Sequence, residues 1–128
     1  MSKNILVEKS YQFSLKIIQL HLQLSRDAKF IYPLCVQLLK SGTSIGANIE
    51  EAIGGYSEKD FAAKLSISYK EAREAKYWLR LLKDSGFLTI TLQDTLLKDI
   101  DELIRILGAI LSTIKKKRDA NLNLKSLD

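Results

Sequence analysis

The chain contains few of the side chains that enzymes use for acid–base, nucleophilic or metal chemistry. It has 1 His and 1 Cys in 128 residues. A carboxylate-bridged di-metal site in a helical bundle needs inward glutamates and two Glu-x-x-His pairs, and here no glutamate is followed by a histidine three residues later. The thiol of Cys35 has no histidine placed to activate it. We therefore expect no enzymatic activity, no bound metal and no cofactor.

Basic residues offer a different kind of chemistry, which is the binding of an anionic partner. Arg73, Lys76, Arg80 and Lys83 are separated by three, four and three residues, so they share one face of a helix. Four cations along about 15 Å of helix can follow a phosphate backbone. An ordinary solvated helix face is the alternative interpretation of this basic stripe.

A second group of cations, Lys115, Lys116, Lys117 and Arg118, is consecutive in the sequence. From Lys115 to Asp128 there are five basic and two acidic residues, so this stretch carries +3 of the net charge of +5. Cations near the end of a helix interact favourably with its dipole, but four in succession exceed that requirement. We expect both basic groups to bind RNA or DNA backbone, and residues 121–127 to be a frayed tail or one ordered by a partner.

Three polar residues, Asn48, Glu51 and Glu71, fall near the middles of two predicted helices. Buried polar groups of this kind can fix the register of packed helices, and we assign the three to a polar register layer. Lining a ligand pocket is the alternative role.

The elements that must position these residues are helices. Apolar residues recur at steps of three and four in four segments, about 4–25, 33–53, 58–85 and 91–114, and no segment shows the alternation of a half-buried strand. Ser57 to Asp60 resembles a capping box at the start of the third segment. The short connections predict an all-α, antiparallel up-down-up-down four-helix bundle. We place the bundle in residues 1–114 and a basic C-terminal end and tail in residues 115–128.

The first predicted helix carries two adjacent apolar ladders. One consists of Tyr11, Leu15, Ile18 and Leu22, and the other of Phe13, Ile17, Leu20 and Leu24. Together they are wider than one core-facing stripe, so we expect the chain to associate with copies of itself. We assign Phe13, Ile17, Leu20 and Leu24 to the interface of this homo-oligomer.

The second predicted helix contains a run of small residues, 41–48, with poor helix propensity. The run is either a loop that splits the segment or a helix that lets a neighbour approach closely. The apolar register continues from Leu38 to Ile49, which favours the continuous helix.

Composition indicates the compartment and excludes some partners. No run of about 18 uncharged apolar residues is present, so we expect no membrane span. A single cysteine and the lack of a signal peptide pattern indicate the reducing cytoplasm. The sequence pI near 9.3 is compatible with an anionic partner.

Two sequence blocks resemble a known family. The stretch 39–52, LKSGTSIGANIEEA, together with Lys59-Asp60-Phe61, Lys64-Leu65 and residues 71–79, EAREAKYWL, is similar to the 23S rRNA intervening-sequence proteins. That resemblance implies a four-helix bundle, often assembled as a ring of about five subunits, with no established enzymatic activity. A more distant resemblance is to the accessory proteins of diversity-generating retroelements, which bind reverse transcriptase and nucleic acid.

Two functions follow as hypotheses. The first is a non-enzymatic, homo-oligomeric scaffold, by resemblance a homopentamer, that binds RNA or DNA backbone. The second is a protein-interaction module, for example one that resembles a reverse-transcriptase accessory protein, whose positive charge is incidental.

Overall fold

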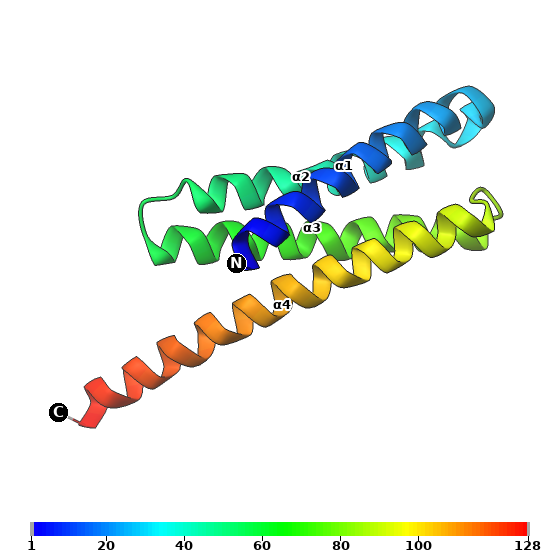
Figure 1. Ribbon diagram of the computed structural model, residues 1–128. Helices are drawn as coiled ribbons and strands as arrows, with labels where there is room; N and C mark the ends of the chain where they lie inside the picture. Colours follow the sequence, from blue (N-terminus) through cyan, green and yellow to red (C-terminus); the bar gives the residue numbers. More distant parts are fainter. Residues whose placement is uncertain (1, 128) are drawn as a thin grey trace.

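The protein is a bundle of long helices in the computed structural model, which describes residues 2–127 and the side chains of residues 5–125. Its four α-helices within that range are α1 (Ser2–Asp27), α2 (Tyr32–Ile53), α3 (Glu58–Asp84) and α4 (Ile90–Leu127), with a short 3₁₀ helix at Lys29–Ile31. Consecutive helices run in opposite directions (Figure 1). The predicted all-α, up-down-up-down bundle is confirmed. No helix among the described residues is long and apolar enough to cross a membrane.

The core is formed by the residues that the helical periodicity selects. On α3 the buried positions include Leu65, Ala72, Ala75, Leu79 and Leu82, all 1% exposed or less. Their steps of three, four and seven residues keep them on one side of the helix. On α4 the apolar residues at steps of three and four form a seam, which is buried at Leu96, Ile100, Leu103 and Leu107 and half-buried at Ile110 and Ile114.

Helix α2 is continuous through the small residues 41–48, which confirms the prediction of a helix there and not a loop. A Cβ placed on Gly42 would lie 3.0 Å from Cγ2 of Ile17 on α1, and one on Gly46 would lie 3.4 Å from the backbone oxygen of Ser10. Both glycines therefore allow α1 to approach α2 more closely than larger side chains would permit. The poor helix propensity of the run is offset by this packing.

The ladder assigned to an interface between subunits is instead part of this chain's own core. Phe13, Ile17, Leu20 and Leu24 are 1%, 0%, 3% and 4% exposed. They face inward because that side of α1 is the one packed against α2. The prediction that they contact another subunit is therefore wrong. The apolar residues that α1 leaves uncovered belong to the other ladder, Tyr11, Leu15, Ile18 and Leu22.

Helix ends follow the predicted signals. Ser57 caps α3, because its side-chain oxygen accepts a hydrogen bond from the backbone N–H of Asp60 at 3.1 Å. Gly86 follows the other end of α3 with a φ of 83°, a conformation that suits glycine. The turns after Ile53 and Asp84 then reverse the chain direction.

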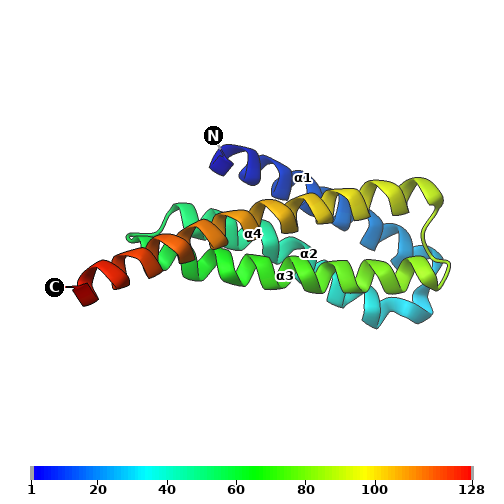
Figure 2. The same ribbon diagram turned by 90° about the horizontal axis from the view of Figure 1, so that it is seen from below.

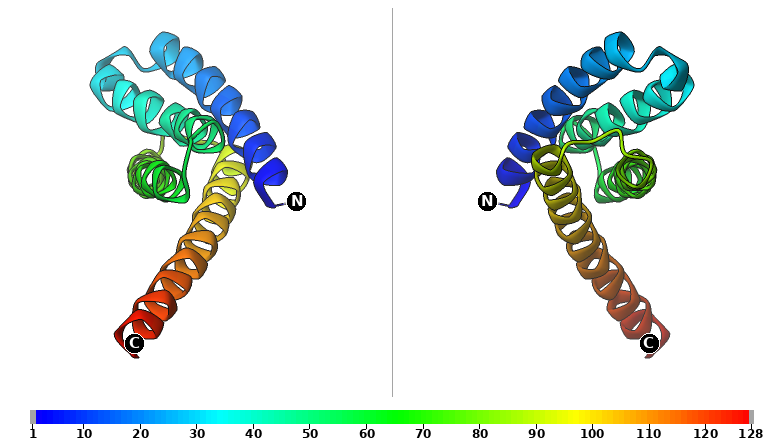
Figure 3. Two further views of the ribbon diagram at one scale, coloured as in Figure 1. Left: turned by 90° about the vertical axis from the view of Figure 1, so that its left-hand side faces the viewer. Right: turned by 90° about the vertical axis from the view of Figure 1, so that its right-hand side faces the viewer.

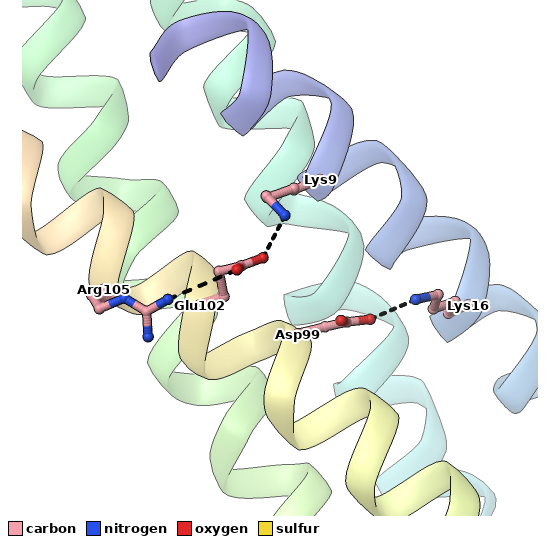
Figure 4. Close-up of polar contacts among 5 residues, drawn as sticks. All are labelled: Lys9, Lys16, Asp99, Glu102 and Arg105. Carbon is pink, nitrogen blue, oxygen red and sulfur yellow. Dashed lines mark hydrogen bonds and ion pairs between the residues drawn. The ribbon is translucent and has the colours of Figure 1, made fainter. Parts of the chain in front are cut away.

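Two ion pairs connect the first and last helices. Lys9 Nζ lies 2.6 Å from Glu102 Oε1, and Lys16 Nζ lies 2.6 Å from Asp99 Oδ2 (Figure 4). Because all four side chains are partly exposed, water and salt screen both pairs, and each adds little to the stability of the fold. The pairs mark where α4 crosses α1 before it continues away from the bundle (Figure 3).

The C-terminal segment is helical, which corrects the expectation of a frayed tail. Helix α4 is 38 residues long and continues to Leu127. Lys, Arg, Ala and Leu are strong helix formers, and neither Pro nor Gly follows Gly108. Every residue from Lys115 to Lys125 is exposed, and this end projects past the other helices (Figure 2). The buried part of α4 thus ends near the predicted boundary at residue 114, but the helix does not.

Candidate nucleic-acid interface

The basic stripe lies on one face of α3, beside α4, and two of its four cations have partners within the chain. Lys76 Nζ lies 2.7 Å from Asp101 Oδ1 on α4. Arg73 lies over the ring of Tyr69, 5.8 Å from its centroid, and donates a 3.4 Å hydrogen bond to the Tyr69 hydroxyl. Arg80 and Lys83 are exposed. The stripe therefore presents less uncompensated charge than the sequence indicates.

Tyr69 and Asp101 are the contributors that sequence reasoning missed. Tyr69 packs against α4 at Gly108, where an added Cβ would lie 3.3 Å from Tyr69 Cε1. The position of Asp101 opposite Lys76 depends on how α4 crosses α3. Of these residues, only Gly108 is a sequence signal that could have predicted a close contact between α3 and α4.

The four consecutive cations, Lys115, Lys116, Lys117 and Arg118, form what we call the basic collar of α4. Successive helical residues are rotated by about 100°, so four in a row surround most of the helix. All four are exposed, and no acidic group among the described residues forms an ion pair with them. The collar is therefore the longest run of consecutive, exposed cations in the described part of the chain.

The stripe and the collar are not brought together in one chain. Lys76 is opposite Asp101, and Lys115 follows Asp101 on α4 by about 20 Å of helix. The stripe lies toward the turn between α3 and α4, whereas the collar lies on the projecting end (Figure 1). A single extended ligand would have to span that distance to contact both.

Asn48, Glu51 and Glu71 do not form the predicted polar register layer. Asn48 Nδ2 donates to the Ser44 carbonyl oxygen of its own helix at 2.8 Å, and Glu51 Oε1 accepts from Lys64 Nζ at 3.2 Å. Glu71 is half-buried, and burial, followed by the nearby charge of Glu74, raises the pKa of its carboxyl. No hydrogen bond in the described range joins the three, because antiparallel α2 and α3 place them at different levels.

The buried polar contact between these helices is made by a serine instead. Ser68 Oγ on α3 donates to the backbone oxygen of Ile45 on α2 at 2.9 Å, and Ser68 is 0% exposed. Ser68 is three residues after Leu65 and four before Ala72, so its spacing places it on the buried face of α3. The small side chain allows the two helices to approach closely, and its hydroxyl has a hydrogen-bond acceptor on the backbone of the neighbouring helix.

Groups with catalytic potential are held in structural contacts. Cys35 is buried, and burial raises the pKa of its thiol. The ring Nδ1 of His21 lies 3.2 Å from the backbone oxygen of Cys35, a contact with the peptide group and not with the sulfur. Among the residues described, no three potential metal ligands gather at one place.

Two shallow hollows flank α1. One, of about 270 Å³, lies between α1 and α2 and is lined by residues that include Ser10, Ser14 and Glu50. The other, of about 230 Å³, lies between α1 and α4 around Lys9, Lys16, Asp99 and Glu102. These four charges are already paired with one another (Figure 4). In the first hollow the hydroxyls of Ser10 and Ser14 donate to the backbone oxygens of Val7 and Ser10, and not to the carboxylate of Glu50.

Comparisons with known proteins agree with this architecture. A solved structure of a protein of unknown function from the S23 ribosomal protein family of Bacteroides thetaiotaomicron is 38% identical in sequence, with a TM-score of 0.83 over 88% of this chain and 99% of that one. No curated protein matches. The family model described as 23S rRNA-intervening sequence protein matches residues 2–109, which include every buried core position. The chain therefore belongs to the 23S rRNA-intervening sequence protein family.

Proposed function

We propose that this protein is a non-enzymatic, homo-oligomeric scaffold that binds the phosphate backbone of a nucleic acid through the basic collar. The observation that carries the proposal is the state of Lys115, Lys116, Lys117 and Arg118, which are exposed, uncompensated and displayed on a projecting helix. Phosphate contacts of this kind release counterions and give affinity with little sequence preference. The family name, which refers to an rRNA insertion, is compatible with such a partner.

The stripe on α3 has a secondary part in this proposal. Arg80 and Lys83 are exposed and available to a phosphate. Lys76 would have to leave Asp101, and Arg73 would have to leave Tyr69, before either contributed fully. We therefore assign most of the binding free energy to the collar and less to Arg73, Lys76, Arg80 and Lys83.

Self-association would multiply these contacts. The outer face of α1 exposes Tyr11, Leu15, Ile18 and Leu22 at 57%, 39%, 41% and 58%. A continuous apolar ladder of this kind on a helix favours a protein partner, and a second copy of the chain is the partner that the proposed scaffold requires. A ring of about five copies, which the family resemblance implies, would present five collars and raise the avidity for one long nucleic acid.

Fluorescence anisotropy across a salt series tests the proposal. The full chain should bind a structured RNA or a duplex DNA with a slope of log K against log salt of about −3 or steeper. A collar variant carrying Lys115→Gln, Lys116→Gln, Lys117→Gln and Arg118→Gln should lose most of that slope.

A matched control removes the same charge elsewhere. Lys29, Lys40, Lys59 and Lys70 are exposed and distant from the collar in the sequence, and changing all four to Gln gives the same net charge as the collar variant. This control should retain most of the affinity. Equal loss in both variants would show that only net charge matters, and no binding by the unmodified chain at low salt would overturn the proposal.

The exposed ladder of α1 also favours a second candidate, a protein-interaction module with incidental charge. Docking through Tyr11, Leu15, Ile18 and Leu22 would be insensitive to salt and to the collar variant. Light scattering distinguishes self-association through this ladder from docking of a different protein. A mass near 14.5 kDa at all concentrations would exclude the homo-oligomer and leave the ladder to a different protein.

A further inference from the structure

The projecting end of α4 lies beyond the buried core of the bundle (Figure 2). From Lys115 to Leu127 it is a single helix about 20 Å long, and its side chains are exposed from Lys115 through Lys125. The bundle core would not need this segment, because the buried seam of α4 has already ended. A helix that is solvated on all sides and basic is available for insertion into a groove.

The charges of this segment are arranged in a specific way around the helix axis. The side of α4 that carries the core seam through Ile110 and Ile114 continues past the bundle as Arg118, Asn121 and Lys125, at steps of three and four. At about 100° per residue, Lys115 and Lys117 lie on the two opposite flanks of that side, and Asp119 points away from it. One polar face is thus bordered by a cation on each flank.

We propose that this end of α4 inserts into the major groove of B-form duplex DNA, an inference that rests on the proposed nucleic-acid binding. A helix is about 10–12 Å across with its side chains, and the B-DNA major groove is about 12 Å wide. With the Arg118–Asn121–Lys125 face toward the base edges, Lys115 and Lys117 reach the phosphates of the two strands. Asp119 then points out of the groove, where its charge does not oppose binding.

The same face contains groups that hydrogen-bond to bases. An arginine donates to the O6 and N7 atoms of guanine, and an asparagine pairs with the N6 and N7 atoms of adenine. Arg118 and Asn121 therefore read base edges, whereas Lys115 and Lys117 set position. Leu122 and Leu124, 58% and 62% exposed, lie on the flanks of this face, on the same sides as Lys115 and Lys117.

The shape of the major groove differs between B-form DNA and double-stranded RNA, so groove insertion predicts different affinities for the two. The major groove of A-form RNA is deep and narrow, and side chains carried on a helix do not read it. A phosphate-binding surface without groove insertion would bind both duplexes comparably. The inference therefore predicts a preference for B-form DNA over double-stranded RNA of the same sequence.

The experiment uses the full chain and three probes at one salt concentration. These are a duplex DNA, a double-stranded RNA of the same sequence, and the duplex DNA with glucosylated 5-hydroxymethylcytosine, whose sugar fills the major groove. We expect the dissociation constant for the unmodified DNA to be lower than that for either other probe by about tenfold or more. Netropsin, a minor-groove ligand, should not compete.

A helix-breaking variant tests the geometry without changing the charge. Ala120→Pro should remove the preference for unmodified DNA while salt-dependent binding through the collar remains, because proline interrupts the helix between Arg118 and Asn121. Ala120→Ser is the matched control and should keep the preference. Equal binding to all three probes, or a preference unchanged by Ala120→Pro, would overturn groove insertion and leave the proposed function standing. A lack of salt-dependent binding to every probe would overturn both.

Discussion

Two regions of this molecule use the same helical backbone in opposite ways. Where α1 meets α2, Gly42 and Gly46 let the helices approach until an added Cβ would lie 3.0 Å from Ile17 and 3.4 Å from Ser10. Past Ile114, every side chain of α4 through Lys125 is exposed. The first region is almost free of charge, and the second carries four consecutive cations.

The packed region and the exposed end of α4 contribute to different properties, the first to stability and the second to the proposed binding. Burial of apolar side chains supplies most of the free energy of folding, and it is concentrated where the helices are in close contact. The exposed end of α4 adds little to that free energy and keeps its charges hydrated and available. Substitutions in the two regions should therefore change different measurements.

The largest effect is expected at the centre of the packed region. Phe13→Ala should lower the free energy of unfolding by about 3–5 kcal/mol, because a fully buried ring is replaced by a cavity. Urea unfolding at fixed protein concentration measures the change. Gln19→Ala, at an exposed position of the same helix outside both apolar ladders, is the control and should change the free energy of unfolding by less than about 1 kcal/mol. Equal losses would show that the ring of Phe13 is not buried in the folded chain.

The glycine contact gives the next largest effect. Gly42→Ala should destabilise the protein by about 1–3 kcal/mol, since the new Cβ would lie 3.0 Å from Ile17 Cγ2. Intrinsic helix propensity alone predicts the opposite sign, a gain of about 1 kcal/mol. Gly54→Ala is the control, because its Cβ would be no closer than 3.7 Å to other atoms. A stabilised Gly42→Ala variant would contradict the close approach of α1.

Removal of the buried serine hydroxyl between α2 and α3 should cost less. Ser68→Ala loses the 2.9 Å hydrogen bond to the Ile45 carbonyl and should reduce the free energy of unfolding by about 0.5–1.5 kcal/mol. The exposed neighbour Ser66 serves as the comparison, with a change within about 0.5 kcal/mol for Ser66→Ala. If both variants lose the same amount, the hydroxyl of Ser68 has no special role.

Glu71 gives a small, pH-dependent effect of opposite sign. Burial raises the pKa of its carboxyl, so the ionised form is less favourable in the folded than in the unfolded chain. Stability from this group is present below the unfolded pKa and is lost as the pH rises through the folded pKa. Glu71→Gln should therefore stabilise the protein slightly at pH 7, by less than about 1 kcal/mol, with no gain near pH 3. A destabilised variant at pH 7 would show that the carboxylate has an important partner.

The smallest effect on stability is expected at the collar. Changing Lys115, Lys116 and Lys117 to Gln should alter the free energy of unfolding by no more than about 0.5 kcal/mol, because all three are exposed and unpaired within the described structure. The same variant should weaken nucleic-acid binding strongly. Thermal unfolding and anisotropy on one preparation compare the two. A large loss of stability would mean that the end of α4 is packed in solution.

Periodicity predicted most of the fold, but not which of two equivalent ladders is buried. On α1 both ladders have the same steps, and Phe13 and Tyr11 differ little in size or apolar character. Only the direction of α2 decides that Phe13 is inside. Likewise, the extension of α4 was misjudged because polar residues and asparagines indicate fraying, whereas the helix continues to Leu127 with its described side chains exposed past Ile114.

The sequence predicted which basic residues share a helix face, but not which of their charges are paired within the chain. The spacing of Arg73, Lys76, Arg80 and Lys83 correctly places them on one helix face. The pairing of Lys76 with Asp101 joins residues that are distant in sequence, so no local pattern contains it. The collar was visible as a run of four cations, and its display on a projecting helix was not.

By itself, the sequence determined the helical class, the seams of α3 and α4, the cap at Ser57 and the concentration of positive charge after Ile114. These depend on residue type and on spacing within one helix, which are local properties of the chain. Tertiary structure alone decided which ladder of α1 is covered, that Ser68 and not Asn48 makes the buried polar contact, and that the basic stripe is partly neutralised by α4. Each of these depends on the angle and offset at which two helices meet, and many side chains from distant segments set those together.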